Sequence, residues 1–505
     1  MAETVIYALY VDWNNDGDYG DAGEDISADW ISVTISRGFN GPLARFPSVG
    51  RMTVNLKNTA QTYSPPATAA ARPRRPVRFT MAYDGDTVTL FEGLIESIRP
   101  DFGTTRSRRA VMECVDRIAV LDRFDGAIAV AKYQKADDII GDVIAAVYTP
   151  DDTNYEVGIH VFPISSDQWI GQEPPERPTT AGTNDTSASD KIQDACVSDW
   201  GRFFIAKDGT PTFYNRHHAP LDTSTELTLD DTMLEMGYQM SVSDVYNVIE
   251  VTCHPRNIGQ TYEVLSSLSR GSSAIIEAGE DVTFDVSFRD PSNNAIQLGG
   301  DEILAPVANV DFVVTDDEPG AGADKTSDIT PGIVPYGTRA EVTLANGAAY
   351  PVYLQSLQVR GKAVRTLEPV TLLASDATSI TAYGKRKLQV DAVLLNEEVS
   401  AQGLSNYLLD YYKDPLHDVR GVTFYGNTNA TLMEAARDLE LLDKVVLTES
   451  QTGLSSETMF IYAMRHNITP GKLHQVSVDL EQAYDTDDPF IIESSLIGGT
   501  DVIIY

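Results

Sequence analysis

Residues 75–98 read RPVRFTMAYDGDTVTLFEGLIESI, and this stretch carries a strong signal for the structure of the first part of the chain. Two runs rich in β-branched and aromatic residues flank Asp84-Gly85. An Asp-Gly pair between such runs is a strong hairpin signal, because both central residues of a type I′ turn need a positive φ. The pattern therefore predicts two antiparallel strands joined at Asp84-Gly85.

Comparable runs continue on both sides of this hairpin, from Val5 to about Asp125. They are TVIYALYVDW, DWISVTISRGF, GRMTVNLKN and RRAVMECVD, and Gly, Pro, Asn or Asp turns separate them. Short strands at close spacing are typical of a β-barrel or sandwich. Residues 1–125 are predicted to form a first tube-like β-domain.

Helical periodicity appears next. Asp137–Val147 (DDIIGDVIAAV) places Ile140, Val143, Ile144 and Val147 on one face, and SASDKIQDACVSDWG gives a second amphipathic helix. A two-strand hairpin about Asp208-Gly209 follows. These elements predict a small α/β, helix-hairpin domain over residues 126–215.

The rest of the chain divides in an unusual way. Strand and helix signals at 216–253 and at 355–487 predict a second tube-like β-domain, and the strand-rich stretch 254–354 reads as a β-sandwich inserted into it. The predicted fold class is therefore mainly β with a small α/β portion, in several domains. Residues 488–505 hold apolar clusters, which indicates a partner-docking tail or an extra strand on the chain's own domain.

Composition restricts the function. The net charge of −36, from 74 acidic and 38 basic residues, disfavours adhesive nucleic-acid binding, because such a surface repels phosphates. Three widely spaced cysteines suggest neither a disulfide framework nor a zinc site. Without a signal-peptide pattern or a long apolar run, we expect synthesis in a reducing cytoplasm and no membrane segment.

The stretch 12–25, DWNNDGDYGDAGED, is the one candidate metal site. Its start matches D-x-[DN]-x-[DN]-G, a pattern that sets hard oxygen ligands for calcium at alternate positions. Gly23 replaces the last glutamate of an EF-hand and the flanks read as strands, so an EF-hand is rejected. A calcium loop on a hairpin and a solvated acidic turn both stay open. The predicted ligands are Asp12, Asn14, Asp16, Asp18, Asp21 and Glu24.

Catalysis finds little support in the sequence. None of the seven histidines lies in HExxH, and no GxSxG elbow or Gly-Lys-Ser/Thr phosphate loop occurs. His217-His218, at a strand end, is expected on the surface rather than as a ligand pair. We predict no catalytic residues, no certain cofactor and no enzymatic activity.

The order of these pieces resembles a known family. DWNNDGDYGDAGEDISADWISVTISRG, GRMTVNLKNTAQTYSPP and VMECVDRIAVLDRF resemble the first domain of tail-tip or baseplate hub proteins of tailed bacteriophages. ACVSDWGRFFIAKDGTPTFYNR and the closing strands LLDKVVLTESQTGLSSETMFIYAMRHNITPGKLHQVSVDLEQA are also similar to such hubs. The likeness covers about four fifths of the chain.

The resemblance implies a homotrimer at the tip of a virion tail. Two tube-like domains per chain would alternate into a pseudo-sixfold ring that joins a sixfold tail tube to threefold tip proteins. Expected partners are a tail tube or distal tail protein and a tip, fibre or tape-measure protein, with DNA only in transit. The inserted sandwich departs from the simplest hub pattern.

Two other functions stay in view. One is a receptor- or carbohydrate-binding tail protein, for which Tyr262, Phe284 and Phe288 are the candidate aromatics, although their alternation favours core positions. The other is a multi-domain β hydrolase with a structural calcium.

Overall fold

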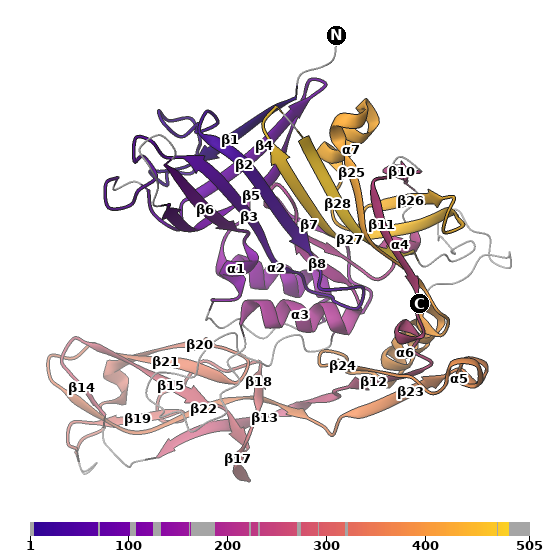
Figure 1. Ribbon diagram of the computed structural model, residues 1–505. Helices are drawn as coiled ribbons and strands as arrows, with labels where there is room; N and C mark the ends of the chain where they lie inside the picture. The colour runs from indigo at the N-terminus through magenta and orange to yellow at the C-terminus, as the bar shows by residue number, and fades with distance from the viewer. Residues whose placement is uncertain are drawn as a thin grey trace.

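A computed structural model shows the molecule as two β-lobes above a helical layer, with a further β-unit projecting to one side (Figure 1). The structure describes residues 5–68, 71–101, 108–124, 133–160, 162, 187–221, 224–230, 233–269, 274–290, 292–318, 322–471 and 473–483. The predicted docking tail, 488–505, lies outside the described residues. The predicted class, mainly β with a small helical portion, is confirmed.

The first lobe is a six-stranded antiparallel array. Its spatial order is β1 (Ile6–Val11), β4 (Pro76–Tyr83), β5 (Asp86–Pro100), β6 (Arg109–Val115), β3 (Ser48–Lys57) and β2 (Trp30–Gly38). The predicted hairpin joins β4 and β5, where Asp84 and Gly85 have φ values of 54° and 84°. Its core includes Phe79, Phe91 and Met112.

The second lobe continues the same sheet. β2 pairs antiparallel with β27 (Leu454–Thr469). From there the sheet runs through β28 (Leu473–Gln482) and β25 (His417–Tyr425) to β11 (Glu235–Met240), and β26 (Lys444–Glu449) and β10 (Leu227–Leu229) branch from β27. Helix α7 (Ala430–Asp438) packs on this lobe through Leu432 and Ala436.

Gly38 explains why the two lobes can meet in one sheet. A Cβ atom at this position would lie 2.4 Å from the Ala463 Cα of β27, and its φ of 135° also favours glycine. The last residue of DWISVTISRG must therefore be a glycine for β2 to lie against β27.

A mixed layer lies beneath the lobes. Helices α1 (Ile118–Leu121), α2 (Ala136–Val147) and α3 (Ala188–Asp199) share one core with α6 (Glu398–Tyr412) and with the sheet of β12 (Val248–Cys253), β23 (Val370–Ser375) and β24 (Lys387–Ala392). The small sheet of β7 (Asn154–Tyr155), β8 (Arg202–Ile205) and β9 (Pro211–Tyr214) and helices α4 (His218–Leu221) and α5 (Ala377–Tyr383) complete this region. The helices predicted at 137–147 and in the stretch around 188–199 are confirmed. This core joins segments that the predicted boundaries place in different domains.

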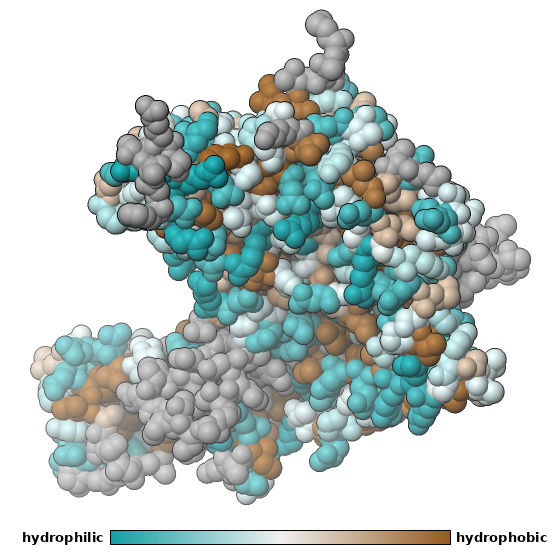
Figure 2. Space-filling view, in the orientation of Figure 1, coloured by the Kyte–Doolittle hydropathy of each residue, from teal (hydrophilic) through white to brown (hydrophobic). Residues whose placement is uncertain are grey.

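A pair of antiparallel strands connects the inserted unit to the rest of the chain. β12 runs on into β13 (Arg256–Ser269), which pairs with β22 (Val352–Thr366), and β22 leads back to β23 beside β12. Its own core, with buried members from Leu265 to Ala363, also packs β14 (Ile275–Ile276), β15 (Asp281–Ser287), β19 (Phe312–Thr315), β20 (Ile329–Pro335) and β21 (Arg339–Asn346). Short strands β16 (Arg289–Asp290), β17 (Asn293–Gln297) and β18 (Gly299–Asp301) complete it. Figure 2 shows an indentation between this unit and the upper body.

Candidate functional site

The acidic loop, residues 12–25, lies along the outer side of edge strand β1. The Val11 N–H donates to the Glu24 carbonyl at 3.0 Å, and the Ile26 N–H donates to the Leu9 carbonyl at 2.9 Å. An isolated bridge also joins Tyr10 to Asp25. The end of this loop therefore covers the second half of an edge that would otherwise be open to strand addition.

Three of the six predicted ligands in this loop lie close to one another in space. Oxygen atoms of Asp12, Asp16 and Glu24 lie within 4.8 Å of one another, and Asp12 and Glu24 are buried. Asp12 accepts backbone N–H groups from Asp16 at 3.3 Å and Gly17 at 3.0 Å. Three carboxylates fit the oxygen preference of calcium, which takes six to eight such ligands.

The other three predicted ligands make different contacts. The Asn14 side-chain amide donates to Asp16 and to Asp21, each at 2.8 Å, and Asp18 accepts the Gly20 N–H at 2.7 Å. These bonds link residues within the turn to one another. A calcium site here stays a prediction, and its core would be Asp12, Asp16 and Glu24.

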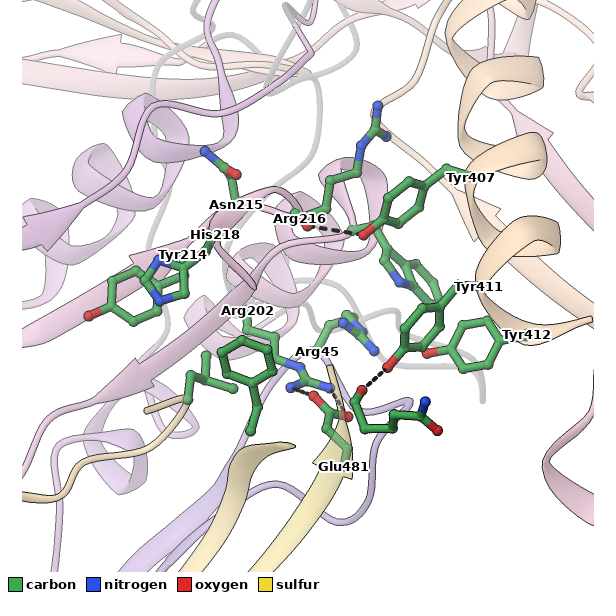
Figure 3. Close-up of a pocket in the computed structure, with 14 residues that line it drawn as sticks. Arg45, Arg202, Tyr214, Asn215, Arg216, His218, Tyr407, Tyr411, Tyr412 and Glu481 are labelled. Atoms are coloured by element: carbon green, nitrogen blue, oxygen red, sulfur yellow. Dashed lines mark hydrogen bonds and ion pairs between the residues drawn. The ribbon is translucent and has the colours of Figure 1, made fainter. Parts of the chain in front are cut away.

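A second candidate site lies where both lobes meet the helical layer (Figure 3). It is a small pocket, with a volume of ≈ 70 Å³, lined mostly by arginine and aromatic side chains from distant segments. Its lining residues are Arg45, Trp200, Arg202, Tyr214, Asn215, Arg216, His218, Tyr407, Tyr411, Tyr412, Leu442, Phe460, Glu481 and Gln482. No serine, threonine or cysteine is among these described residues, so the pocket offers no hydroxyl or thiol nucleophile of those types.

A bidentate ion pair in the pocket joins β8 to β28. Arg202 binds Glu481 through both guanidinium Nη atoms, with Nη2 at 2.8 Å from Oε2, and Nη2 also donates to the Pro42 carbonyl at 2.5 Å. Burial alone would lower the pKa of the Arg202 guanidinium. The charge and hydrogen bonds of Glu481 have a larger effect in the opposite direction, so the pKa is raised. Bidentate pairing of this kind fixes geometry as well as charge. It ties the helix-hairpin region to the last strand of the second lobe.

Arg45 extends this contact to the first lobe. Its guanidinium lies 4.5 Å from the centroid of the Trp200 ring and donates to the Pro42 carbonyl at 2.6 Å. Burial lowers the pKa of Arg45, and the neighbouring charge of Arg202 lowers it further. The loop between β2 and β3 is thus fixed against the end of α3.

Two histidine expectations meet different outcomes. His217 is buried, which corrects the predicted surface position, because the turn before α4 folds it toward Tyr407. His218 stacks on Tyr214 with ring centroids 3.7 Å apart, and its Nδ1 lies 2.6 Å from Glu156 Oε1. Both residues act as packing elements of the junction.

A buried polar chain crosses from the first lobe to the second. The Tyr7 hydroxyl lies 3.0 Å from His474 Nδ1, and His474 Nε2 lies 2.9 Å from His466 Nδ1. Burial lowers the pKa of His474 to about 4 and that of His466 well below its ordinary value, which the charge of a protonated His474 would lower further. Both rings are therefore neutral at pH 7.

The aromatic residues weighed for glycan binding are mostly core. Phe288 is fully buried and Phe284 packs against the same core, whereas Tyr262 is 51% exposed and carries Lys362 over its ring at 5.6 Å. Of these three candidates, only Tyr262 presents an exposed ring.

The junction residues were beyond sequence reasoning. Arg45, Arg202 and Glu481 belong to no sequence motif. They also lie up to several hundred positions from one another in the chain. One sequence signal could have indicated the pair: Arg202 directly precedes the apolar run FFIA. A charged side chain that such a run carries into the interior requires a partner of opposite charge.

Comparisons with known proteins give only structural matches. No protein-family model matches the chain, and no curated protein matches it in sequence. A tail protein from Neisseria meningitidis MC58 is similar at 10% identity and a TM-score of 0.47, over 95% of this chain and 96% of that one. The 43 kDa tail protein of prophage MuSo2 from Shewanella oneidensis is similar at 9% identity and a TM-score of 0.47, over 94% and 98%.

A third match comes from Escherichia coli. It is a component of the type VI secretion system described as structurally similar to the T4 bacteriophage tail proteins gp27 and gp5, and it matches at 7% identity and a TM-score of 0.39, over 95% of this chain and 80% of that one. These three neighbours are thus described as tail proteins or as similar to T4 tail proteins. No helix among the described residues is long and apolar enough to span a membrane.

Proposed function

We propose that this protein is a structural component of a phage tail tip, where three copies form the ring-shaped hub. The observation that carries the proposal is the single sheet shared by the two lobes. Its twelve strands divide equally, six from the first lobe and six from the second. Two comparable lobes in each of three copies supply the six positions that a sixfold tube would contact.

The ends of this sheet support closure into a ring. β1 and β11 are the outermost strands of its main path, on opposite lobes, and β11 has no further partner among the described strands. Contact between the β11 side of one copy and the β1 side of the next is a head-to-tail interface, which generates a ring when the rotation closes. The acidic loop then lies at the junction between copies.

Charge supports a channel for DNA. Three copies carry 3 × −36 = −108 formal charges at neutral pH. A wall with an excess of acidic side chains repels phosphates, so DNA in transit would not adhere to it. The tube or distal tail protein would bind one face of the ring, and the tip, fibre or tape-measure protein the other.

The mass of the purified protein in solution tests the ring. One chain has a mass of 55.1 kDa, and a trimer would have 3 × 55.1 = 165.3 kDa. Met240 of β11 is 53% exposed, and Met240→Lys places a charge at the proposed contact. We expect light scattering to show a trimer, alone or with its tube partner, that Met240→Lys weakens.

A matched control separates the interface from general surface effects. Val399→Lys introduces the same charge at an apolar residue that is 82% exposed on α6. This variant should assemble as the wild type does. A protein that stays monomeric with and without its tube partner would overturn the ring. Equal assembly of the two variants would overturn the contact at β11.

A further inference from the structure

An apolar groove lies beside the arginine pocket, at the place where the described chain stops. It has a volume of ≈ 240 Å³ and combines the β2–β3 loop, the end of α6 and the end of β28. Its apolar lining residues include Pro42, Leu43, Ala44, Tyr246, Leu416 and Leu480. The groove therefore spans the first lobe, the helical layer and the second lobe.

The end of β28 is held in the wall of this groove. The Tyr411 hydroxyl donates to the Gln482 carbonyl at 2.6 Å, and the His417 N–H donates to Gln482 Oε1 at 2.9 Å. One residue later the Ala483 N–H donates to the Thr458 carbonyl at 2.9 Å. Whatever follows Ala483 in the chain therefore starts at the groove.

The sequence after Ala483 has two parts. Residues 484–488, YDTDD, are polar and acidic, and residues 489–497, PFIIESSLI, hold two apolar clusters separated by Glu493, Ser494 and Ser495. Five extended residues reach about 17 Å, at about 3.4 Å each. That length suffices for the apolar part to return to the groove, and so short a link keeps it there at high effective concentration.

We propose that the groove binds residues 489–497 of the same chain. The argument combines an apolar groove on a described surface, the fixed exit of the chain at its wall, and an apolar segment within reach. Segment 489–497 would connect the β2–β3 loop of the first lobe to α6 and to β28. The proposal is independent of the hub assignment, since it concerns one copy only.

Crosslinking in the full-length protein tests it directly. The native thiols Cys114, Cys196 and Cys253 are buried, so introduced cysteines can be addressed with a short bismaleimide. Ala44→Cys places a thiol in the groove and Ser494→Cys places one in the middle of the segment. We expect a high yield of the intramolecular crosslink, identified by mass spectrometry of the linked peptides.

The control must lie near the same exit but outside the groove. Ser455 is exposed on β27, three residues before Thr458, and Ser455→Cys with Ser494→Cys meets that condition. The groove pair should give a yield at least several-fold above this control. Leu416→Glu, or excess synthetic peptide of residues 489–497, should reduce the groove pair to the control level.

Two results would overturn the proposal. Equal yields for the Ala44 and Ser455 pairs would show that the segment does not occupy the groove. Crosslinks that join two copies, seen as a doubled mass on a denaturing gel, would show that the occupant comes from another chain.

Discussion

The buried pair Arg202–Glu481 should be among the most sensitive points of the lobe junction. Glu481→Gln keeps the size of the side chain and removes its charge. The exposed fractions of the two side chains are 8% and 11%, so Arg202 would be left charged and buried with only carbonyl and amide oxygens as partners. Removing one partner of such a pair costs about 3–5 kcal/mol of unfolding free energy.

A surface pair provides the reference for this loss. Arg51 Nη1 lies 2.8 Å from Glu96 Oε2, but the two side chains are 57% and 31% exposed. Glu96→Gln is the same chemical change, and an exposed pair contributes only about 0–1 kcal/mol. The difference between the two variants therefore measures burial rather than the loss of one carboxylate.

Urea unfolding, followed by tryptophan fluorescence and circular dichroism, is the assay. With a slope of about 3 kcal/mol/M, the transition that includes the junction should move down by about 1 M or more in Glu481→Gln. The double variant Arg202→Met/Glu481→Met should recover most of this loss, because neither member of the pair is left charged without the other. If Glu481→Gln costs no more than Glu96→Gln, the pair does not hold the junction.

Three further predictions test other parts of the molecule. The pKa of His474 is about 4 in the folded protein and about 6.5 in the unfolded chain, so the unfolded chain takes up a proton first as the pH falls. The free energy of unfolding should therefore be unaffected by His474 above about pH 6.5 and should fall by up to about 3 kcal/mol as the pH approaches 4. The wild type should lose more stability than His474→Asn across this range, and parallel pH profiles would contradict the prediction. Gly38→Val should separate or unfold the lobes, since its Cβ atom would overlap the backbone of β27, and a melting temperature within about 2 °C of the wild type would refute this. Calcium at a hundredfold excess over its dissociation constant should raise the free energy of unfolding by about 2.7 kcal/mol, and with it the melting temperature, in the wild type and in Asp18→Asn but not in Asp12→Asn. No response of the wild type to calcium or to a chelator would remove the metal site.

The sequence predicted local elements better than their assembly. Asp84-Gly85 specifies its own turn through φ, and the helical stretch 137–147 specifies itself through periodicity, so both appear where expected. Helix α7 was not predicted, although Asn429 caps it by accepting the Leu432 N–H at 2.8 Å, because nine residues with few large apolar side chains give a weak pattern. The pairing of β2 with β27 joins residues more than four hundred positions apart, and only the glycine at position 38 hints at it.

The two candidate sites differ in the same way: one is local in the sequence and the other is built from distant segments. The acidic loop is contiguous, so a sequence pattern can name a group of candidate ligands there, and the structure brings the oxygen atoms of Asp12, Asp16 and Glu24 together by folding the turn around Asp12. That these residues bind calcium stays a prediction. The arginine pocket is assembled from several segments that no spacing rule connects. Its charges pair only after the strands have found their register, which is a property of the whole fold.

The relative orientation of the lobes is the quantity on which a ring depends. Three head-to-tail copies close only if the angle between the β1 side and the β11 side is fixed, because a small error per copy opens the ring into a helix. In this chain three sets of contacts restrain the lobes: the sheet that crosses at Gly38, the Arg202–Glu481 pair, and the polar chain from Tyr7 to His466. A variant that loosens one of these contacts without unfolding either lobe should therefore lose assembly before it loses secondary structure. Light scattering and circular dichroism on Glu481→Gln, at a urea concentration below its transition, would distinguish such a loss from ordinary unfolding.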